Sequence, residues 1–254
     1  MKKTIYRLLL AVCIIVFLVS AFMIGKHFYE QYRSQADFKQ LTQFIESAEL
    51  EETVSMAPDK NEVKLNAYQK LKVKNEDFVG WISIPGTKIN YPVMQTVTDP
   101  EFYLRRNFEK EDSQHGTPFI DYRNDLTNPS DNIIIYGHHM KDGTMFADLI
   151  QYSEFSFYQN HPNVYFDTVN EQGEYQIVSV FKTPSYGDNV FMYHNYIDFQ
   201  SQEEFDEYYQ EVQNRSLYDT GVPLAFGDKF ITLSTCEYSL EDDGRFVVLA
   251  KKIS

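Results

Sequence analysis

Apolar residues follow different patterns in successive parts of the chain. Residues 8–24 form an unbroken run of seventeen uncharged, mostly apolar residues. Residues 28–50 are polar and charged with apolar positions at helical spacing, which predicts a helical stalk. A hinge is expected over 51–60 and a second short helix over 62–73. From residue 78 onward, short or alternating apolar runs separated by Gly, Pro, Asn and Asp are typical of strands and turns.

Eight short runs predict strands, and two helical segments interrupt them. One short helix follows Gly143, and a longer one begins at Ser201, where Ser201 and Glu204 fit a capping box. The domain is therefore expected to be mainly β with helical insertions, arranged as a barrel or a sandwich. The predicted strands are 78–84, 89–94, 117–121, 132–136, 163–166, 174–182, 229–236 and 245–252.

The first apolar run predicts a single membrane anchor. Leu8 to Gly25 is long enough to cross a bilayer. Lys2, Lys3 and Arg7 precede it, so the positive-inside rule places everything after Lys26 outside the cell. The alternative is a cleaved signal peptide, for which 19–21 offers a small-residue cleavage site. Because the apolar run continues beyond that site, we favour an uncleaved anchor.

Composition supports one folded domain and excludes a nucleic-acid partner. The chain has 254 residues, of which 43% are hydrophobic and 16% aromatic, enough for a substantial core. The part after residue 26 holds 19 of the 23 basic residues and all 37 acidic ones, a net charge of −18. Such a surface disfavours nucleic acid and mildly favours amine-bearing ligands, although it is also typical of any exported protein.

One cysteine lies outside the apolar run. Cys13 is within the run, so Cys236 has no intramolecular partner on the oxidising side of the membrane. A lone thiol there is either deeply buried or chemically used. Strand alternation in "DKFITLSTC" places Cys236 on the more polar face with Thr232 and Ser234. The residues alone leave a structural and a functional thiol both open.

A base and a cation are available to this thiol. An apolar strand ends at Gly137 and presents His138 and His139, between which periodicity does not distinguish. Adjacent histidines point to opposite sides, and no metal-binding spacing is present. A polar loop returns the chain from Cys236 to Arg245, which an antiparallel pair would place near the thiol. The alternative partners of that arginine are the acids at 241–243.

Several motifs, in this order, resemble the class B sortases, which are cysteine transpeptidases on the surface of Gram-positive bacteria. The central motifs are "IYGHHM", "TLSTCE" and "GRFVVLAKK". Further likeness is carried by "FVGWISIPGTKINYPVMQ", "FYLRRNF", "GTPFIDYRND" and "GTMFADL". The likeness extends from about Ala67 to Ile253.

The resemblance implies an eight-stranded sortase-type β-barrel with an N-terminal helical extension and one transmembrane helix. The implied domains are 1–26 (cytoplasmic tip and anchor), 27–66 (stalk and extension) and 67–254 (catalytic domain). The loop 184–200 and the helix from Ser201 are expected to form a wall of the groove. The implied catalytic residues are His138, Cys236 and Arg245, and the implied substrate-binding residues are Leu104, Tyr136, Ser234 and Glu237.

The implied reaction is a two-step acyl transfer that needs no metal or other cofactor. A thioester forms with the sorting signal of an exported protein and passes to an amine of peptidoglycan or of a pilin subunit. The enzyme would be a single-pass membrane protein with its catalytic domain outside. The competing hypotheses are a cell-wall cysteine peptidase and a non-catalytic membrane-anchored adhesin or assembly factor.

Overall fold

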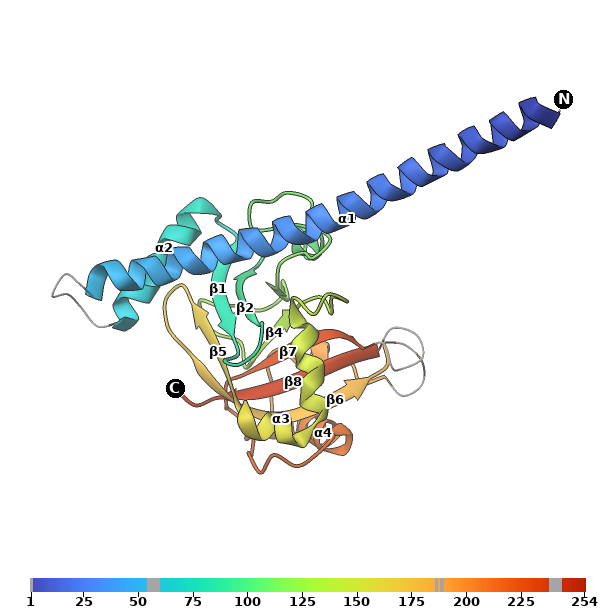
Figure 1. The fold of residues 1–254 in the computed structure, drawn as a ribbon. Coiled ribbons are helices and arrows are strands. Elements are labelled where there is room, and N and C mark those ends of the chain that lie inside the picture. The colour runs from blue at the N-terminus through green and yellow to red at the C-terminus, as the bar shows by residue number, and fades with distance from the viewer. Residues whose placement is uncertain (1, 54–59, 186, 188–189, 238–243) are drawn as a thin grey trace. The chain divides into compact units, whose positions relative to one another are not determined.

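The computed structural model of the chain describes residues 2–53, 60–185, 187, 190–237 and 244–254 (Figure 1). The chain divides into two compact units, one ending at Gln40 and the other running from Leu41 to Ser254. The first unit consists of most of the long helix α1 (Lys2–Thr53). The second unit holds the end of α1, the remaining helices and the strands of the described chain.

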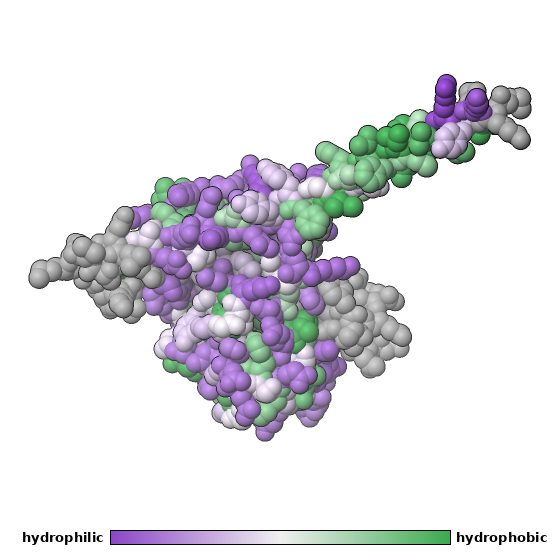
Figure 2. Space-filling model, in the orientation of Figure 1, coloured by the Kyte–Doolittle hydropathy of each residue, from purple (hydrophilic) through white to green (hydrophobic). Residues whose placement is uncertain are grey.

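Helix α1 exposes its apolar N-terminal part. The large side chains of 8–24 are exposed, and Figure 2 shows them as a green stretch along the helix. Ile5–Ala48 is the one candidate among the described helices for a membrane span, judged by length and composition. The anchor and stalk expected from the sequence are thus one continuous helix, which ends at Thr53 within the expected hinge. The rest of that hinge, 54–59, lies outside the described residues.

The second unit is built on a closed barrel of eight strands, as the sequence predicted. The order around the barrel is β1-β2-β3-β4-β7-β8-β6-β5. Neighbouring strands are antiparallel except for the parallel pairs β2/β3 and β4/β7. The strands are β1 (Phe78–Ser83), β2 (Asn90–Met94), β3 (Phe119–Ile120), β4 (Asn132–Tyr136), β5 (Asn163–Thr168), β6 (Glu174–Thr183), β7 (Phe230–Glu237) and β8 (Gly244–Lys252).

Helices connect and cover the strands. The expected second helix is α2, and the expected short helix after Gly143 is the 3-10 helix η2. Ser201 caps α4 by accepting from the Glu204 amide at 3.2 Å, and the Glu204 carboxylate accepts from the Gln200 amide at 2.9 Å. The sequence did not predict η1, α3 or η3. The helices after α1 are α2 (Lys60–Lys74), η1 (Phe102–Leu104), η2 (Phe146–Ser153), α3 (Phe155–Asn160), η3 (Tyr193–Asn195) and α4 (Gln202–Arg215).

A buried carboxylate fastens α2 to the barrel. Asp167 at the end of β5 accepts a hydrogen bond from the Tyr68 hydroxyl at 2.9 Å and pairs with the Lys64 ammonium at 2.7 Å. Its second oxygen accepts from the Gly173 amide at 3.2 Å. A buried charge is tolerated when its lone pairs are satisfied in this way. The contact fixes the helix that leads into β1.

Helix α4 covers one face of the sheet formed by β6, β8 and β7. Phe205, Tyr208 and Val212 share a helical face and pack against Phe230 of β7 and Leu249 of β8. Because this layer covers β7, both faces of that strand are buried from Phe230 to Thr235. The other members of this aromatic-rich cluster are Val178, Phe181, Phe191, Tyr193, Phe199, Leu224 and Val247.

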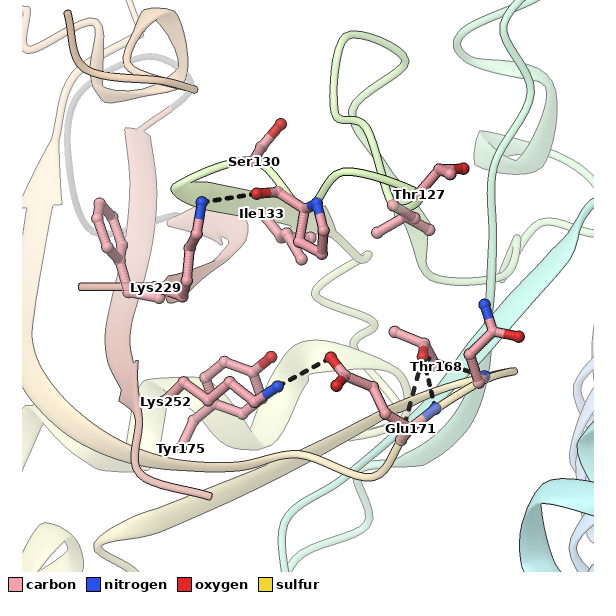
Figure 3. A pocket seen from close by; sticks show the side chains of 12 residues that line it. Thr127, Ser130, Ile133, Thr168, Glu171, Tyr175, Lys229 and Lys252 are labelled. Atoms are coloured by element: carbon pink, nitrogen blue, oxygen red, sulfur yellow. Dashed lines mark hydrogen bonds and ion pairs between the residues drawn. The ribbon is translucent and has the colours of Figure 1, made fainter. Parts of the chain in front are cut away.

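The start of β7 and the end of β8 border a cavity of about 460 Å³ at one end of the barrel (Figure 3). Two lysines lie on it, and each is paired. Lys252 pairs with Glu171 at 2.8 Å, as the dashed line between them in Figure 3 marks. Lys229 donates to the Pro129 carbonyl at 2.7 Å. Lys229 also pairs with Asp131 at 2.8 Å. Ion pairs between loops and strand ends therefore tie this end of the barrel together.

The α4 layer predicts a measurable loss of stability when one aromatic ring is removed. Phe205→Ala should lower the free energy of unfolding by about 3–5 kcal/mol, because the ring is buried in the cluster and leaves a cavity. Urea denaturation of the full chain measures the change. Gln213→Ala, at an exposed position of the same helix, should stay within about 0.5 kcal/mol of wild type. Equal effects of the two changes would contradict this packing.

Candidate active site

Cys236 lies near the carboxyl end of β7, directly opposite Arg245 of β8. The Ser234 carbonyl of β7 accepts from the Gly137 amide on the β4 side at 3.1 Å. Main-chain groups alternate in direction along a strand, so those of Cys236 also face the β4 side. Cys236 and Arg245 are then a non-hydrogen-bonded antiparallel pair, the kind whose side chains approach most closely, with Cα atoms ~4.5 Å apart. The thiol is partly exposed.

Arg245 also takes part in a local main-chain contact. Its Nη1 donates to the Gly244 carbonyl at 3.1 Å. The acids at 241–243, which the sequence offered as alternative partners of this arginine, lie outside the described residues. The structure thus places a guanidinium and a thiol side by side on one face of the β7/β8 pair.

His138 follows β4 on the same face. Tyr136, the last residue of β4, pairs with Ser234 in the parallel register, and His138 and Cys236 each follow two residues later in the chain and line one cavity. Packing requires a glycine at position 137, between Tyr136 and His138, since a Cβ there would lie 2.6 Å from the Phe146 ring. The close approach of that ring leaves room for glycine alone at this position.

The ring of His138 is held by a main-chain carbonyl. Its Nε2 lies 2.8 Å from the Leu104 oxygen. A carbonyl only accepts hydrogen bonds, so Nε2 carries the hydrogen and Nδ1 of the neutral ring is free of one. Nδ1 is therefore the nitrogen that can gain and lose a proton.

The Leu104 carbonyl is fixed by the short helix η1. Thr117 donates its amide to the Tyr103 carbonyl at 2.9 Å, and the Tyr103 hydroxyl donates to Asp77 at 3.0 Å. Gly116 packs against this turn with a φ of +60°, and a Cβ there would lie 2.6 Å from the Leu104 oxygen. Both its conformation and its contacts favour glycine. The orientation of His138 is therefore set by a segment far from it in the sequence.

One cavity of about 520 Å³ joins these groups. His138, Cys236 and Arg245 all line it. Three of the four residues expected to bind substrate line it as well: Leu104, Tyr136 and Ser234. For Glu237 the structure describes the main chain, which pairs with Gly244, but not the side chain.

A polar network supports one side of the cavity. The Tyr136 hydroxyl donates to Asp121 at 3.0 Å, and Arg123 donates to both oxygens of Asp121 at 2.8 Å. Arg123 also donates to the His194 carbonyl at 2.6 Å, which links this network to the segment after β6. Although burial alone raises the pKa of Asp121, the bonds from Arg123 and Tyr136 outweigh it and the pKa is lowered. Asp121 is therefore a charged structural support.

The loop 184–200, which follows β6, forms another wall of the cavity, as the sequence predicted. Phe191 and Tyr193 line the cavity but are almost fully buried, and the Tyr193 hydroxyl bonds to the Ser234 hydroxyl at 2.6 Å. Tyr186, a further aromatic residue of this loop, lies outside the described residues. The expectation for α4 was wrong, because none of the described lining residues belongs to that helix. It packs behind the wall, against the strands.

Burial governs the protonation of the cavity histidine. Burial lowers the pKa of His138, and electrostatic interactions with Arg105 and His115 lower it further, against the raising effect of the hydrogen bond to the Leu104 carbonyl. In the described part of the chain no carboxylate hydrogen-bonds to His138. The arrangement thus offers a neutral base, a thiol and a fixed cation around one cavity, which suits nucleophilic acyl transfer.

Sequence reasoning missed several residues that line the cavity. Glu101, Thr183, His194 and Thr235 are examples. Glu101 lies in a loop, His194 in the short helix η3, and Thr183 and Thr235 near the ends of β6 and β7, and no motif distinguishes any of them. Asp121 could have been found, because "IDYRND" places two opposite charges two residues apart after an apolar strand.

Comparisons with known proteins agree with this geometry. The Sortase domain family matches residues 82–253. Sortase B of Staphylococcus aureus (strain NCTC 8325 / PS 47) is 33% identical over 254 residues, covering 98% of this chain and 96% of that protein. The chain belongs to the class B sortases. The sortase is accordingly a cysteine transpeptidase that acts in cell-wall protein sorting, and α1 is its candidate membrane span.

Solved structures resemble this sortase closely. The Staphylococcus aureus sortase B–substrate complex has a TM-score of 0.76 at 32% identity, covering 89% of this chain and 99% of that one. A sortase B complexed with triglycine has a TM-score of 0.75 at 32% identity, covering 88% of this chain and 100% of that one. The likeness therefore includes the barrel and its helices.

The lowered pKa of His138 predicts how stability depends on pH. The folded protein binds a proton at His138 less readily than the unfolded chain, whose histidine titrates near 6.5. Wild type should lose stability relative to His138→Gln as the pH falls below about 6.5, until the folded pKa is passed. Urea denaturation of both proteins from about pH 7.5 to about pH 5 measures the difference. A difference that is constant, or that grows in favour of wild type, would contradict the burial argument.

Proposed function

We propose that Cys236, His138 and Arg245 are the catalytic residues of this sortase. The single observation that carries the proposal is the convergence of a thiol, an imidazole and a guanidinium, from the ends of three neighbouring strands, on one cavity. No two of them are adjacent in sequence, so the sheet brings them together.

The first half of the reaction forms a thioester. The Cys236 sulfur attacks a backbone carbonyl carbon of the sorting signal, and the thiol proton passes to Nδ1 of His138. The carbonyl oxygen becomes an oxyanion beside the Arg245 guanidinium, which stabilises it. When the C–N bond breaks, His138 returns the proton to the leaving amine.

The second half releases the acyl group to an acceptor amine. The amine nitrogen attacks the thioester carbon and gives a proton to His138, and the C–S bond then breaks. Cys236 and His138 return to their starting states. The acceptor is an amine of a peptidoglycan precursor or of a pilin subunit, and the complex of a related sortase B with triglycine supports a glycine amine.

The sorting signal would lie along the described cavity. Leu104, Tyr136 and Ser234 line it and offer an apolar contact and two hydroxyl groups. We include Glu237 because its main chain directly follows Cys236. The Ser234 hydroxyl is already bonded to Tyr193, which fixes its direction before substrate arrives.

The chain would reach the cell wall from a membrane anchor. We propose 1–26 as cytoplasmic tip and anchor, 27–66 as stalk and helical extension, and 67–254 as the catalytic domain. The basic residues before the apolar run support a cytoplasmic N-terminus. The exposed apolar surface of α1 supports membrane contact.

Mass spectrometry tests the proposed chemistry directly. The full chain in detergent, incubated with sorting-signal peptides, should gain an acyl adduct on Cys236, because the thiol is partly exposed in the cavity. Adding triglycine should remove the adduct and give an amide-linked product. Cys236→Ala should form neither.

Other outcomes of that experiment point to the competing functions. A free carboxylate product that triglycine leaves unchanged would identify a peptidase. A wild-type thiol that no peptide acylates and iodoacetamide does not alkylate would identify a structural cysteine and overturn the proposal.

Removing the guanidinium should slow acylation. Arg245→Ala is expected to lower the acylation rate about a hundred- to a thousandfold, since it removes donors to the oxyanion. Arg245→Lys should recover part of the rate, because a lysine keeps the charge but not the planar fork. Single-turnover acylation measures the effect, with Lys252→Ala at the opposite end of β8 as control. Equal rates for the two alanine variants would argue against the assigned role.

A further inference from the structure

His139, the neighbour of the proposed base, is bonded to the main chain of the proposed nucleophile. Its Nδ1 lies 3.0 Å from the Cys236 carbonyl oxygen. The carbonyl can only accept, so Nδ1 carries the hydrogen and donates it. This contact leaves the side chain of Cys236 untouched and acts on its backbone.

The hydrogen bond from the His139 ring takes the place of a main-chain hydrogen bond that would continue the β4/β7 ladder. In a parallel pair the ladder bonds recur every two residues. The Gly137 amide donates to the Ser234 carbonyl at 3.1 Å, so the next ladder bond would join the amide of residue 139 to the Cys236 carbonyl. Strand β4 has ended by then, at Tyr136, and the His139 ring supplies the donor in its place.

The main chain of His139 is directed elsewhere. It forms an isolated antiparallel bridge with Met145, and the Phe146 amide donates to the His138 carbonyl at 2.9 Å. Met145 has a φ of +56°, and its amide donates to the Tyr91 hydroxyl at 3.1 Å. These contacts hold the His138–His139 segment in a turn, so its backbone leaves the edge of β7.

Strand β8 does not provide the missing donor. The Ser234 carbonyl faces β4, and carbonyls two residues apart on a strand face the same way. The Cys236 carbonyl therefore points away from β8. On the β8 side the chain is held by the pairing of the flanking residues, Thr235 with Phe246 and Glu237 with Gly244, and His139 holds Cys236 itself on the β4 side.

We propose that His139 is a positioning residue that fixes the backbone of Cys236 and thereby the sulfur in the cavity. The proposal rests on the proposed role of Cys236 as nucleophile. A small displacement of a reacting group costs as much as a hundredfold in rate. His139 would act through Cys236, in contrast to His138, which exchanges protons itself.

Two substitutions with the same arrangement of heavy atoms distinguish an effect of the hydrogen bond from an effect of packing. His139→Asn keeps a donor near the position of Nδ1, whereas His139→Leu has a similar volume and no donor. Both variants are made in the full chain, and thermal unfolding is recorded for each. Comparing them with each other keeps the test valid even if both are less stable than wild type.

Single-turnover acylation of Cys236 is the decisive measurement. His139→Leu should acylate about ten- to a hundredfold more slowly than wild type at saturating peptide. Its KM for peptide should stay within about twofold, since the bond does not contact substrate in this scheme. His139→Asn should recover most of the rate, and iodoacetamide alkylation of Cys236 should follow the same order.

Equal acylation rates of the Asn and Leu variants would overturn the positioning role, whether both are fast or both are slow. A change confined to KM would also overturn it. Failure of the proposed function has a different signature, because then wild type itself forms no thioester.

Discussion

The hydrogen-bonded ladder that joins β4, β7 and β8 is the constraint on which the active site depends. Parallel β4 and β7 end at the same edge of the sheet, and antiparallel β8 begins there. The ends of these three strands therefore meet at one edge, with Cys236 next to last in β7, Arg245 second in β8 and His138 two residues beyond the end of β4. The pleat then decides which face each group occupies. Strand pairing sets Cys236 beside Arg245, and the hydrogen bond from His138 to the Leu104 carbonyl orients the ring of His138 at the same cavity.

The sequence predicted the parts of the site that depend on the alternation of apolar residues in strands and on turn residues. Alternation and turn residues located eight strands, and the loop before Arg245 placed it near Cys236. The choice between His138 and His139 could not be made from β4 alone, because it depends on the register with β7. The resemblance to a family supplied the choice of His138, which stays a prediction, and the register with β7 supports it. The Leu104 carbonyl could not be predicted, because its place depends on η1, a turn outside the repeating patterns. The prediction for α4 was wrong for a similar reason. Its apolar face is evident from the sequence, but the sequence does not show which part of the protein that face packs against.

Electrostatics at the cavity differ from those of the whole protein. The chain carries a net charge of −14, yet the buried carboxylate of the cavity, Asp121, is committed to Arg123 and Tyr136. Arg245 keeps its influence on neighbouring groups, since it contributes to lowering the pKa of His194 and opposes the rise that burial causes for Tyr193. Burial, by contrast, sets the pKa of His138. Charge from Arg245 and burial of His138 are thus independent influences on the cavity, and among the described residues no carboxylate hydrogen-bonds to His138.

The two adjacent histidines each stabilise a different segment at this edge of the sheet. Each ring donates to a main-chain carbonyl, His138 to Leu104 and His139 to Cys236. Consecutive side chains point to opposite sides, so one dipeptide contacts two separate segments. The first bond selects the tautomer that leaves Nδ1 of His138 free for proton transfer, and the second replaces a ladder bond that β4 no longer makes. The segment after β4 thus fixes the tautomer of His138 and, in the proposed scheme, the backbone that carries the sulfur of Cys236.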